Sequence, residues 1–157
     1  MTIAASAPLD LRREFLSLLP RLRRFALTLA RSATQADEVV RAAYGCAIAD
    51  SDCLSGEGPA AARLFALIRR TAADLNATSK SEPVQADDFQ PSGERKTLVL
   101  SMPDGEASAF LLVDVENFSY LQAADILGIT QELLASHVCD ARRSFASTMA
   151  QTVQLRA

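Results

Sequence analysis

The chain has 157 residues, of which 49% are hydrophobic and 22% are charged, and its net charge is -3. This is an ordinary globular composition with room for one modest core or two small ones, and the abundance of Ala, Leu and Arg without any Trp favours helices over sheet. Because no apolar run approaches the roughly 20 residues that span a bilayer, and Met1 to Leu9 lack the basic flank of a signal peptide, we expect a cytoplasmic protein without membrane contact.

The first predicted helix carries one continuous apolar stripe. We expect Asp10 to cap its start. Apolar residues then recur every three or four positions, which places them on one side of a helix: Leu11, Phe15, Leu18, Leu22, Phe25 and Leu29. Pro20 interrupts this pattern, so we expect a kink or a short break there. The opposite face is basic and suits solvent, an acidic partner or phosphates; it holds Arg12, Arg13, Arg21, Arg23, Arg24 and Arg31.

Two more helices complete the first half of the chain. Thr34 followed by Asp37 resembles a capping box and predicts the start of the second helix. Its buried face is predicted to be Ala36, Val39, Val40, Ala43, Tyr44 and Ala47. Residues 49–58 have the composition of a loop, and Pro59 suits the first turn of a third helix. The inward side chains of that helix are predicted to be Leu64, Phe65, Ile68, Ala72 and Leu75.

The middle of the chain separates two lobes of opposite charge. Helical periodicity disappears from Ala77 to Lys96, where Ser, Pro, Asp, Gln and Gly dominate. We therefore predict an all-α protein with two small helical lobes, at residues 10–77 and 96–152, joined by a flexible linker over 78–95. Residues 1–80 hold 11 Lys/Arg against 8 Asp/Glu, a net charge of +3, whereas residues 81–157 hold 5 against 11, a net charge of -6.

The second lobe has the layout of a helix-turn-helix. After a predicted turn at Pro103–Gly105, an apolar helix is expected over Ala107–Val115. Ser119 with Gln122 matches a capping box that opens a short packed helix. Two helices that cross steeply need a small residue and a left-handed turn between them, and Gly128 supplies both.

The last predicted helix runs from Gln131 to about Ala150, with Thr130 as its cap. Its apolar residues, spaced four, three and four apart, are predicted to face the lobe: Leu134, Val138, Ala141 and Phe145. That leaves an outer surface of Gln131, Ala135, Ser136, Arg142 and Arg143, with His137 at its border.

Cysteine and histidine give no sign of catalytic or metal chemistry. The three cysteines, Cys46, Cys53 and Cys139, are an odd number, which indicates reduced thiols, although Cys46 and Cys53 could pair for redox sensing. His137 and Cys139 lie two positions apart and therefore on different faces of a helix, so we predict no metal site. His137 has no evident nucleophile as partner and no Gly-rich phosphate loop exists, so we predict neither an enzyme nor a bound cofactor.

Several stretches resemble the conserved regions of extracytoplasmic-function RNA polymerase sigma factors. Residues 19–30 and 36–40 resemble the second conserved region of that family, and residues 63–70 look like its promoter-facing helix. Residues 109–120 and 122–129 are similar to its fourth region. The sigma-like domain of general-stress-response regulators is a related branch.

The resemblance implies a transcription-initiation factor with two binding surfaces. The first lobe would dock on the coiled coil of the polymerase clamp through Asp37, Glu38, Val39, Arg41 and Tyr44. It would meet promoter DNA through Arg63, Arg69 and Arg70. The last helix of the second lobe would enter the major groove, with base or phosphate contacts from Gln131, Ser136, His137, Arg142 and Arg143. Core RNA polymerase, promoter DNA and an anti-sigma protein are the implied partners.

The departures from the family pattern keep a second reading open. Arg41 and Ala42 replace a Gln and a Glu of the docking helix, and Arg63 replaces a Trp. Basic positions of the recognition helix are taken by Ala135, His137 and Asp140. An acidic lobe is repelled by the DNA backbone. The alternative is therefore a sigma-factor mimic that binds an anti-sigma protein rather than DNA; an unrelated helical adaptor is a third reading.

Overall fold

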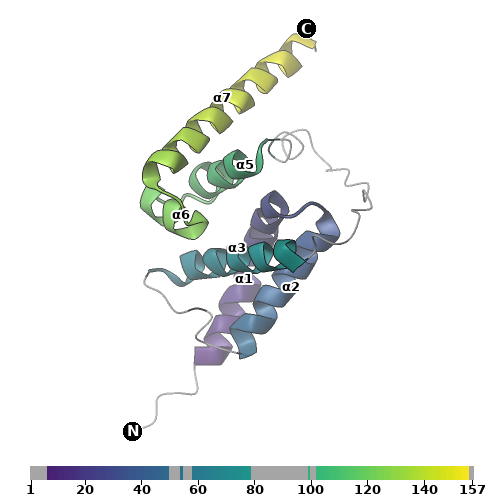
Figure 1. The fold of residues 1–157 in the computed structure, drawn as a ribbon, viewed down its shortest axis with the longest axis vertical. Helices are drawn as coiled ribbons and strands as arrows, with labels where there is room; N and C mark the ends of the chain where they lie inside the picture. Colours follow the sequence, from purple (N-terminus) through teal and green to yellow (C-terminus); the bar gives the residue numbers. More distant parts are fainter. Residues whose placement is uncertain (1–6, 50–53, 55–57, 79–98, 100–101, 156–157) are drawn as a thin grey trace. The chain divides into compact units, whose positions relative to one another are not determined.

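The computed structural model describes residues 7–49, 54, 58–78, 99 and 102–155, and all regular structure among them is helical (Figure 1). The chain divides into two compact units, Met1–Asp87 and Asp88–Ala157. The predicted all-α fold with two small helical lobes is confirmed, and the division falls inside the segment predicted as the linker. Most of that segment lies outside the described residues. Among the described helices, none is both long and apolar enough to cross a membrane.

The first unit is a bundle of three helices that all contact one another: α1 (Ala7–Leu29), α2 (Ala33–Ala49) and α3 (Ala60–Thr78). Phe25 of α1 lies at its centre, with its ring centroid 5.3 Å from that of Phe65 on α3. The predicted inward faces of the three helices are largely confirmed. The core comprises Phe15, Leu22, Phe25, Ala36, Val39, Ala43, Leu64, Phe65 and Ile68, all almost completely buried.

The cap predicted at Asp10 and the break predicted as one alternative at Pro20 are both absent from α1. The helix begins at Ala7, so Asp10 lies inside it rather than at its cap, and it runs without a break through Pro20. Proline lacks the N–H that would bond to the carbonyl of Leu16. Both residues are exposed, so water can reach that carbonyl, while buried Leu22 and Phe25 hold the helix beyond the proline.

The start of α2 is also capped differently from the prediction. Ser32 directly precedes the helix, and its Oγ accepts a hydrogen bond from the Gln35 amide at 3.1 Å. The Gln35 side chain accepts one from the Arg31 amide at 2.8 Å. The cap predicted at Thr34 is wrong because Thr34 is already within the first turn. Asp37 does not take part in this cap and instead forms an ion pair with Arg23 of α1.

The second unit contains α5 (Asp104–Phe110), a π-helical turn η3 (Leu111–Val115), α6 (Tyr120–Leu127) and α7 (Gln131–Leu155). The turn predicted at residues 103–105 is wrong. Pro103 precedes α5 with φ -52°, which is compatible with entry into a helix, so the chain goes straight into the helix at Asp104. The apolar helix predicted over residues 107–115 is present, with its second half in the wider π form.

The helix-turn-helix of α6 and α7 agrees with the sequence. The Ser119–Gln122 capping box is complete, and Gly128 has the left-handed conformation at φ 64° and ψ 39°. Thr130 caps α7 by accepting a hydrogen bond from the Leu133 amide at 3.2 Å. The predicted inner residues Leu134, Val138 and Ala141 are completely buried, and Phe145 stacks on Phe110 at 5.4 Å. The helix extends past its predicted end, to Leu155.

The orientation of α1 can be tested by making the same substitution at a buried and at an exposed leucine. Leu22 has an exposed fraction of 0% and Leu16 one of 57%. Leu22→Ala removes a core side chain and leaves a cavity, so we expect it to lower the free energy of unfolding by about 2–5 kcal/mol. Leu16→Ala should change it by less than about 0.5 kcal/mol. Urea unfolding followed by far-UV circular dichroism measures both. Equal effects would contradict the described orientation of α1.

Ser119 tests the capping box of α6. Its replacement by Ala removes the acceptor for the Gln122 amide, so we expect a loss of about 0.5–2 kcal/mol in the free energy of unfolding. Ser144→Ala, at an exposed site within α7, should be neutral or slightly stabilising because Ala is the better helix former. Thermal unfolding measures the stability of both variants. An unchanged stability of Ser119→Ala would contradict the capping role.

Candidate functional site

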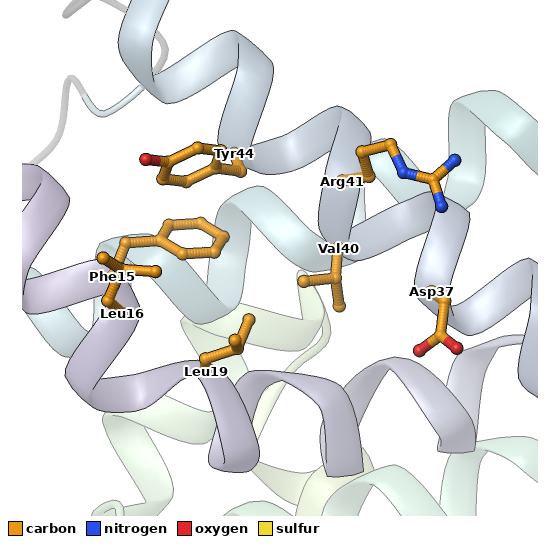
Figure 2. A pocket seen from close by; sticks show the side chains of 7 residues that line it. All are labelled: Phe15, Leu16, Leu19, Asp37, Val40, Arg41 and Tyr44. Atoms are coloured by element: carbon orange, nitrogen blue, oxygen red, sulfur yellow. The ribbon is translucent and has the colours of Figure 1, made fainter.

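An apolar hollow lies between α1 and α2 of the first unit (Figure 2). Its volume is about 240 Å³, and its lining residues are Phe15, Leu16, Leu19, Asp37, Val40, Arg41 and Tyr44. Leu16 and Leu19 are among the most exposed large apolar side chains of this unit, with exposed fractions of 57% and 37%. They lie outside the buried stripe of α1, so the hollow presents apolar surface to solvent.

The hollow has an aromatic end and a charged end. The rings of Phe15 and Tyr44 meet edge to face, with centroids 5.0 Å apart and planes at 62°. Figure 2 shows these two rings at one end and the side chains of Asp37 and Arg41 at the other, with Val40 between them on α2. An apolar centre beside charged side chains is the arrangement found at protein–protein interfaces.

Asp37 joins α2 to α1. Its carboxylate accepts two hydrogen bonds from Arg23, one from Nε at 2.6 Å and one from a terminal nitrogen at 3.2 Å. The hydrogen bond to Asp37 is the main reason that the pKa of Arg23 lies above its ordinary value, and burial opposes the shift. The pair fixes the two walls of the hollow relative to each other at the charged end.

The residues predicted to bind polymerase fall into two groups. Asp37, Arg41 and Tyr44 line the hollow, and Glu38 is exposed on the same helix. Val39 is 1% exposed and belongs to the core of the unit, so it is not available to a partner in this structure. The polymerase contact itself stays a prediction for all five.

The arginines of α3 differ in their exposure and in their hydrogen bonds. Arg63 is half-buried and donates a hydrogen bond from its terminal nitrogen to the carbonyl of Leu54 at 3.2 Å, while its Nε is buried without a partner. Arg63 therefore joins α3 to Leu54. Arg70 is exposed and Arg69 is half-buried. These two are the better placed to meet a phosphate.

The outer surface of α7 holds the residues predicted to read DNA. Gln131, Ser136, Arg142 and Arg143 are exposed, as expected. His137 is half-buried, and its ring covers Gly105 of α5 so closely that a methyl group there would lie 3.1 Å from the His137 Cε1 atom. His137 is thus a packing residue at the border of this surface.

Both arginines of α7 are held by carboxylates. Arg142 donates to the two oxygens of Asp114 at 2.7 and 3.0 Å, and Arg143 donates to Asp140 at 2.8 Å. The hydrogen bond that Arg142 donates to Asp114 is the main reason that the pKa of Arg142 is raised. Since Glu132 is exposed on the same helix, the positive potential that this surface could offer to DNA is small.

Three residues of these surfaces were not predicted from the sequence, namely Leu16, Leu19 and Asp114. Leu16 and Leu19 are apolar residues outside the buried stripe. Apolar residues in excess of those that the stripe needs could have indicated an exposed apolar surface on this helix. Nothing in the local sequence pointed to Asp114, because its partner lies 28 residues away.

The cysteines differ from one another. Cys139 is free and exposed, but Cys46 is disulfide-bonded, so the expectation of a reduced thiol is wrong for Cys46. An odd number of cysteines excludes only complete pairing. Cys53 lies outside the described residues. The described part of the chain brings together no group of three or more side chains suited to a metal ion.

Known families and proteins match both units. The model of the Sigma2 domain of PhyR matches residues 16–69, and that of Sigma-70 region 4 matches residues 96–145. A curated relative, the ECF RNA polymerase sigma factor EcfG of Rhodopseudomonas palustris, is 29% identical; the match covers 89% of this chain and 85% of the relative.

Solved structures share the fold. The sigma factor RpoE of Bartonella quintana, crystallised with the anti-sigma factor NepR, has a TM-score of 0.73 at 22% identity, over 90% of this chain and 97% of that one. The PhyRSL–NepR complex of Sphingomonas sp. Fr1 has a TM-score of 0.68 at 22% identity, over 92% of this chain and 88% of that one. With region 2 and region 4 domains matched in that order, the chain is similar to the extracytoplasmic-function sigma factors and their sigma-like relatives.

Proposed function

We propose that this chain is an alternative sigma factor, which brings core RNA polymerase to promoters for transcription initiation and has no catalytic chemistry of its own. It acts in the cytoplasm, where the polymerase is. The observation that carries the proposal is the hollow between α1 and α2, with exposed Leu16 and Leu19 beside it, in a unit that matches a sigma region 2 domain. We assign the domains to residues 10–77 and 96–152.

The hollow suits a helical partner such as the coiled coil of the polymerase clamp. A helix that enters an apolar groove contributes side chains from successive turns, and the hollow offers Leu16 and Leu19 from successive turns of α1 in return. Glu38 and Arg41 are exposed on α2 and form no ion pair among the described residues. Carrying opposite charges, they would define the orientation of the partner.

An anti-sigma protein is the second partner that we propose. Two solved structures of similar fold contain the anti-sigma factor NepR. A protein that silences this chain would cover the surface that polymerase needs. The hollow and its leucines are the natural target, because an apolar surface of this kind gains most from being removed from water.

Promoter DNA would be met by both units. In the first unit, Arg69 and Arg70 of α3 would contact phosphates. In the second, α7 would enter the major groove, with Gln131 and Ser136 as base-edge contacts and Arg142 and Arg143 on phosphates. Because two arginines of α7 are the main cationic contribution, and both are paired with carboxylates, DNA binding by α7 is weak.

The same ion pairs favour a second candidate function, a sigma mimic that sequesters an anti-sigma protein without binding DNA. The match of the first unit to the Sigma2 domain of PhyR supports this candidate as well. The two functions share the hollow as a docking surface. They differ in whether polymerase and DNA are bound.

Leu16→Ala tests the docking surface, and it is expected to leave the fold intact. If Leu16 sits near the centre of the interface with core polymerase, its truncation should weaken binding about tenfold, since a central apolar side chain contributes more than about 1 kcal/mol. Val153→Ala, at an exposed apolar site of the second unit, is the matched control and should have no effect. Biolayer interferometry with immobilised core polymerase measures both.

The charged residues beside the hollow are tested in the same assay. The double variant Glu38→Ala/Arg41→Ala keeps the net charge and should weaken polymerase binding about threefold. Arg31→Ala/Asp74→Ala removes the same two charges from other exposed sites and serves as its control. Unchanged binding in Leu16→Ala and in the double variant would contradict the polymerase-docking role.

Binding of the full chain to labelled promoter duplexes, followed by fluorescence anisotropy, separates the two candidate functions. With at most four phosphate contacts, two from each unit, the affinity should be low and should fall by no more than roughly 150-fold between about 50 and 200 mM salt. Tight, sequence-selective binding that survives physiological salt would contradict the weak role that we assign to α7. No binding at low salt, together with no binding to core polymerase, would favour the mimic.

A further inference from the structure

An ion pair links the recognition helix to a different element of its unit. Asp114 belongs to the π-helical turn η3, and Arg142 lies near the middle of α7. Both guanidinium-to-carboxylate hydrogen bonds are short, at 2.7 and 3.0 Å, which is the parallel two-point arrangement that an arginine also forms with a phosphate. One arginine cannot offer the same two N–H groups to both acceptors at once.

We propose that Asp114 is an intramolecular competitor of DNA, which holds Arg142 away from the phosphate backbone and thereby lowers the DNA affinity of the recognition helix. The inference rests on the proposed function, because it concerns the same DNA-binding surface. Asp114 is a positioning residue in this role. Arg142 is the residue that would touch the nucleic acid.

Because the ion pair is partly exposed, a phosphate can displace the Asp114 carboxylate from Arg142, and the carboxylate can bind again when the phosphate leaves. The Arg142 side chain is 52% exposed and that of Asp114 is 27% exposed. An exposed ion pair contributes little to stability, so a phosphate can displace the carboxylate at modest cost. The carboxylate remains beside the displaced arginine and repels the phosphate. Each effect weakens DNA binding without preventing it.

The π-helical turn explains why an acidic residue reaches this position. The amide of Glu116 donates to the carbonyl of Leu111 at 2.9 Å, five residues back, and that of Phe118 donates to Leu112 at 3.0 Å. The wider turn adds a residue relative to an α-helix and changes which side chains face α7. Leu111 and Leu112 remain buried while Asp114 meets Arg142. π-Helical turns often occur at functional sites.

The other arginine of α7 does not share this property. Arg143 is paired with Asp140, three residues before it on the same helix. That carboxylate travels with the recognition helix and belongs to its surface in every state. Asp114 instead belongs to a separate element, so the charge of the recognition helix itself is unaffected when Asp114 is replaced.

The test compares two charge-matched variants of the full chain, Asp114→Asn and Asp125→Asn. Asp125 is exposed on α6 and does not contact Arg142, so its replacement by Asn removes the same charge from the same unit and leaves the ion pair in place. The probe is a fluorescein-labelled duplex of random sequence, because phosphate contacts do not depend on sequence. We expect Asp114→Asn to bind about two- to fivefold more tightly than Asp125→Asn. Its plot of log affinity against log salt should be steeper by up to about 0.9, the value for one complete phosphate contact, which the unchanged chain makes only in part.

The dependence on Arg142 completes the test. In an Arg142→Ala background, the gain from Asp114→Asn should shrink to that from Asp125→Asn. Equal effects of the two asparagine variants in the wild-type background would overturn the inference, as would weaker binding by Asp114→Asn. Absence of duplex binding by every variant at low salt would overturn it too. Binding to core polymerase, measured in parallel, shows separately whether the proposed sigma-factor function fails.

Discussion

The apolar stripe of α1 is buried against α2 and α3, and this burial determines which surface of the first unit remains available. Phe15, Leu22 and Phe25 turn inward and are almost completely buried. Because α1 continues through Pro20 as one helix, Leu16 and Leu19 are held at fixed positions on its outer side. Burying Leu22 contributes on the order of 2 kcal/mol to the stability of the unit. Leu16 is exposed and does not contribute a similar free energy to folding, but a partner that covers this side chain would gain it on binding.

Ion pairs between helices act on orientation more than on stability in both units. The Arg23–Asp37 and Arg142–Asp114 pairs are both partly exposed, and such pairs contribute between about 0 and 1 kcal/mol. Their geometry has larger consequences. The first pair joins the walls of the hollow, and the second occupies the cation that α7 could offer to a phosphate. In each unit, a carboxylate on one helical element thus determines where the guanidinium group of an arginine on another element lies.

Features that depend on neighbouring residues could be predicted from the sequence. The capping box at Ser119 and the left-handed Gly128 follow from local rules of backbone geometry, and the inner face of α7 follows from helical periodicity. Local rules failed where two candidates competed, as at Thr34, where Ser32 lies one position before the helix and caps it instead. They also predicted a possible break at Pro20 that is absent, because burial of Leu22 and Phe25 outweighs the lost hydrogen bond.

The candidate sites were less predictable because they depend on contacts between distant residues. The sequence placed Asp37, Arg41 and Tyr44 on one helix, but the hollow exists only because α1 supplies its other wall. For Val39 the two kinds of sequence evidence disagreed: the family pattern placed it at the docking surface, whereas helical periodicity placed it in the core, where it is buried. The charge of -6 over residues 81–157 indicated weak DNA binding, yet the pairing of Arg142 with Asp114 spans 28 residues and has no local signature.

Weak DNA binding by α7 is compatible with a role in promoter recognition because the second unit does not search for DNA alone. A sigma factor bound to polymerase through its first unit has its second unit tethered near the DNA that the polymerase holds. For two sites joined in this way, the effective concentration reaches the millimolar range, so that avidity can exceed either affinity by about 10²–10⁴. A recognition helix with few free cations then binds little DNA by itself but contributes once the first unit is docked. Under the proposed function, the apolar surface of α1 and α2, rather than the charge of α7, would therefore dominate the affinity of the assembled complex.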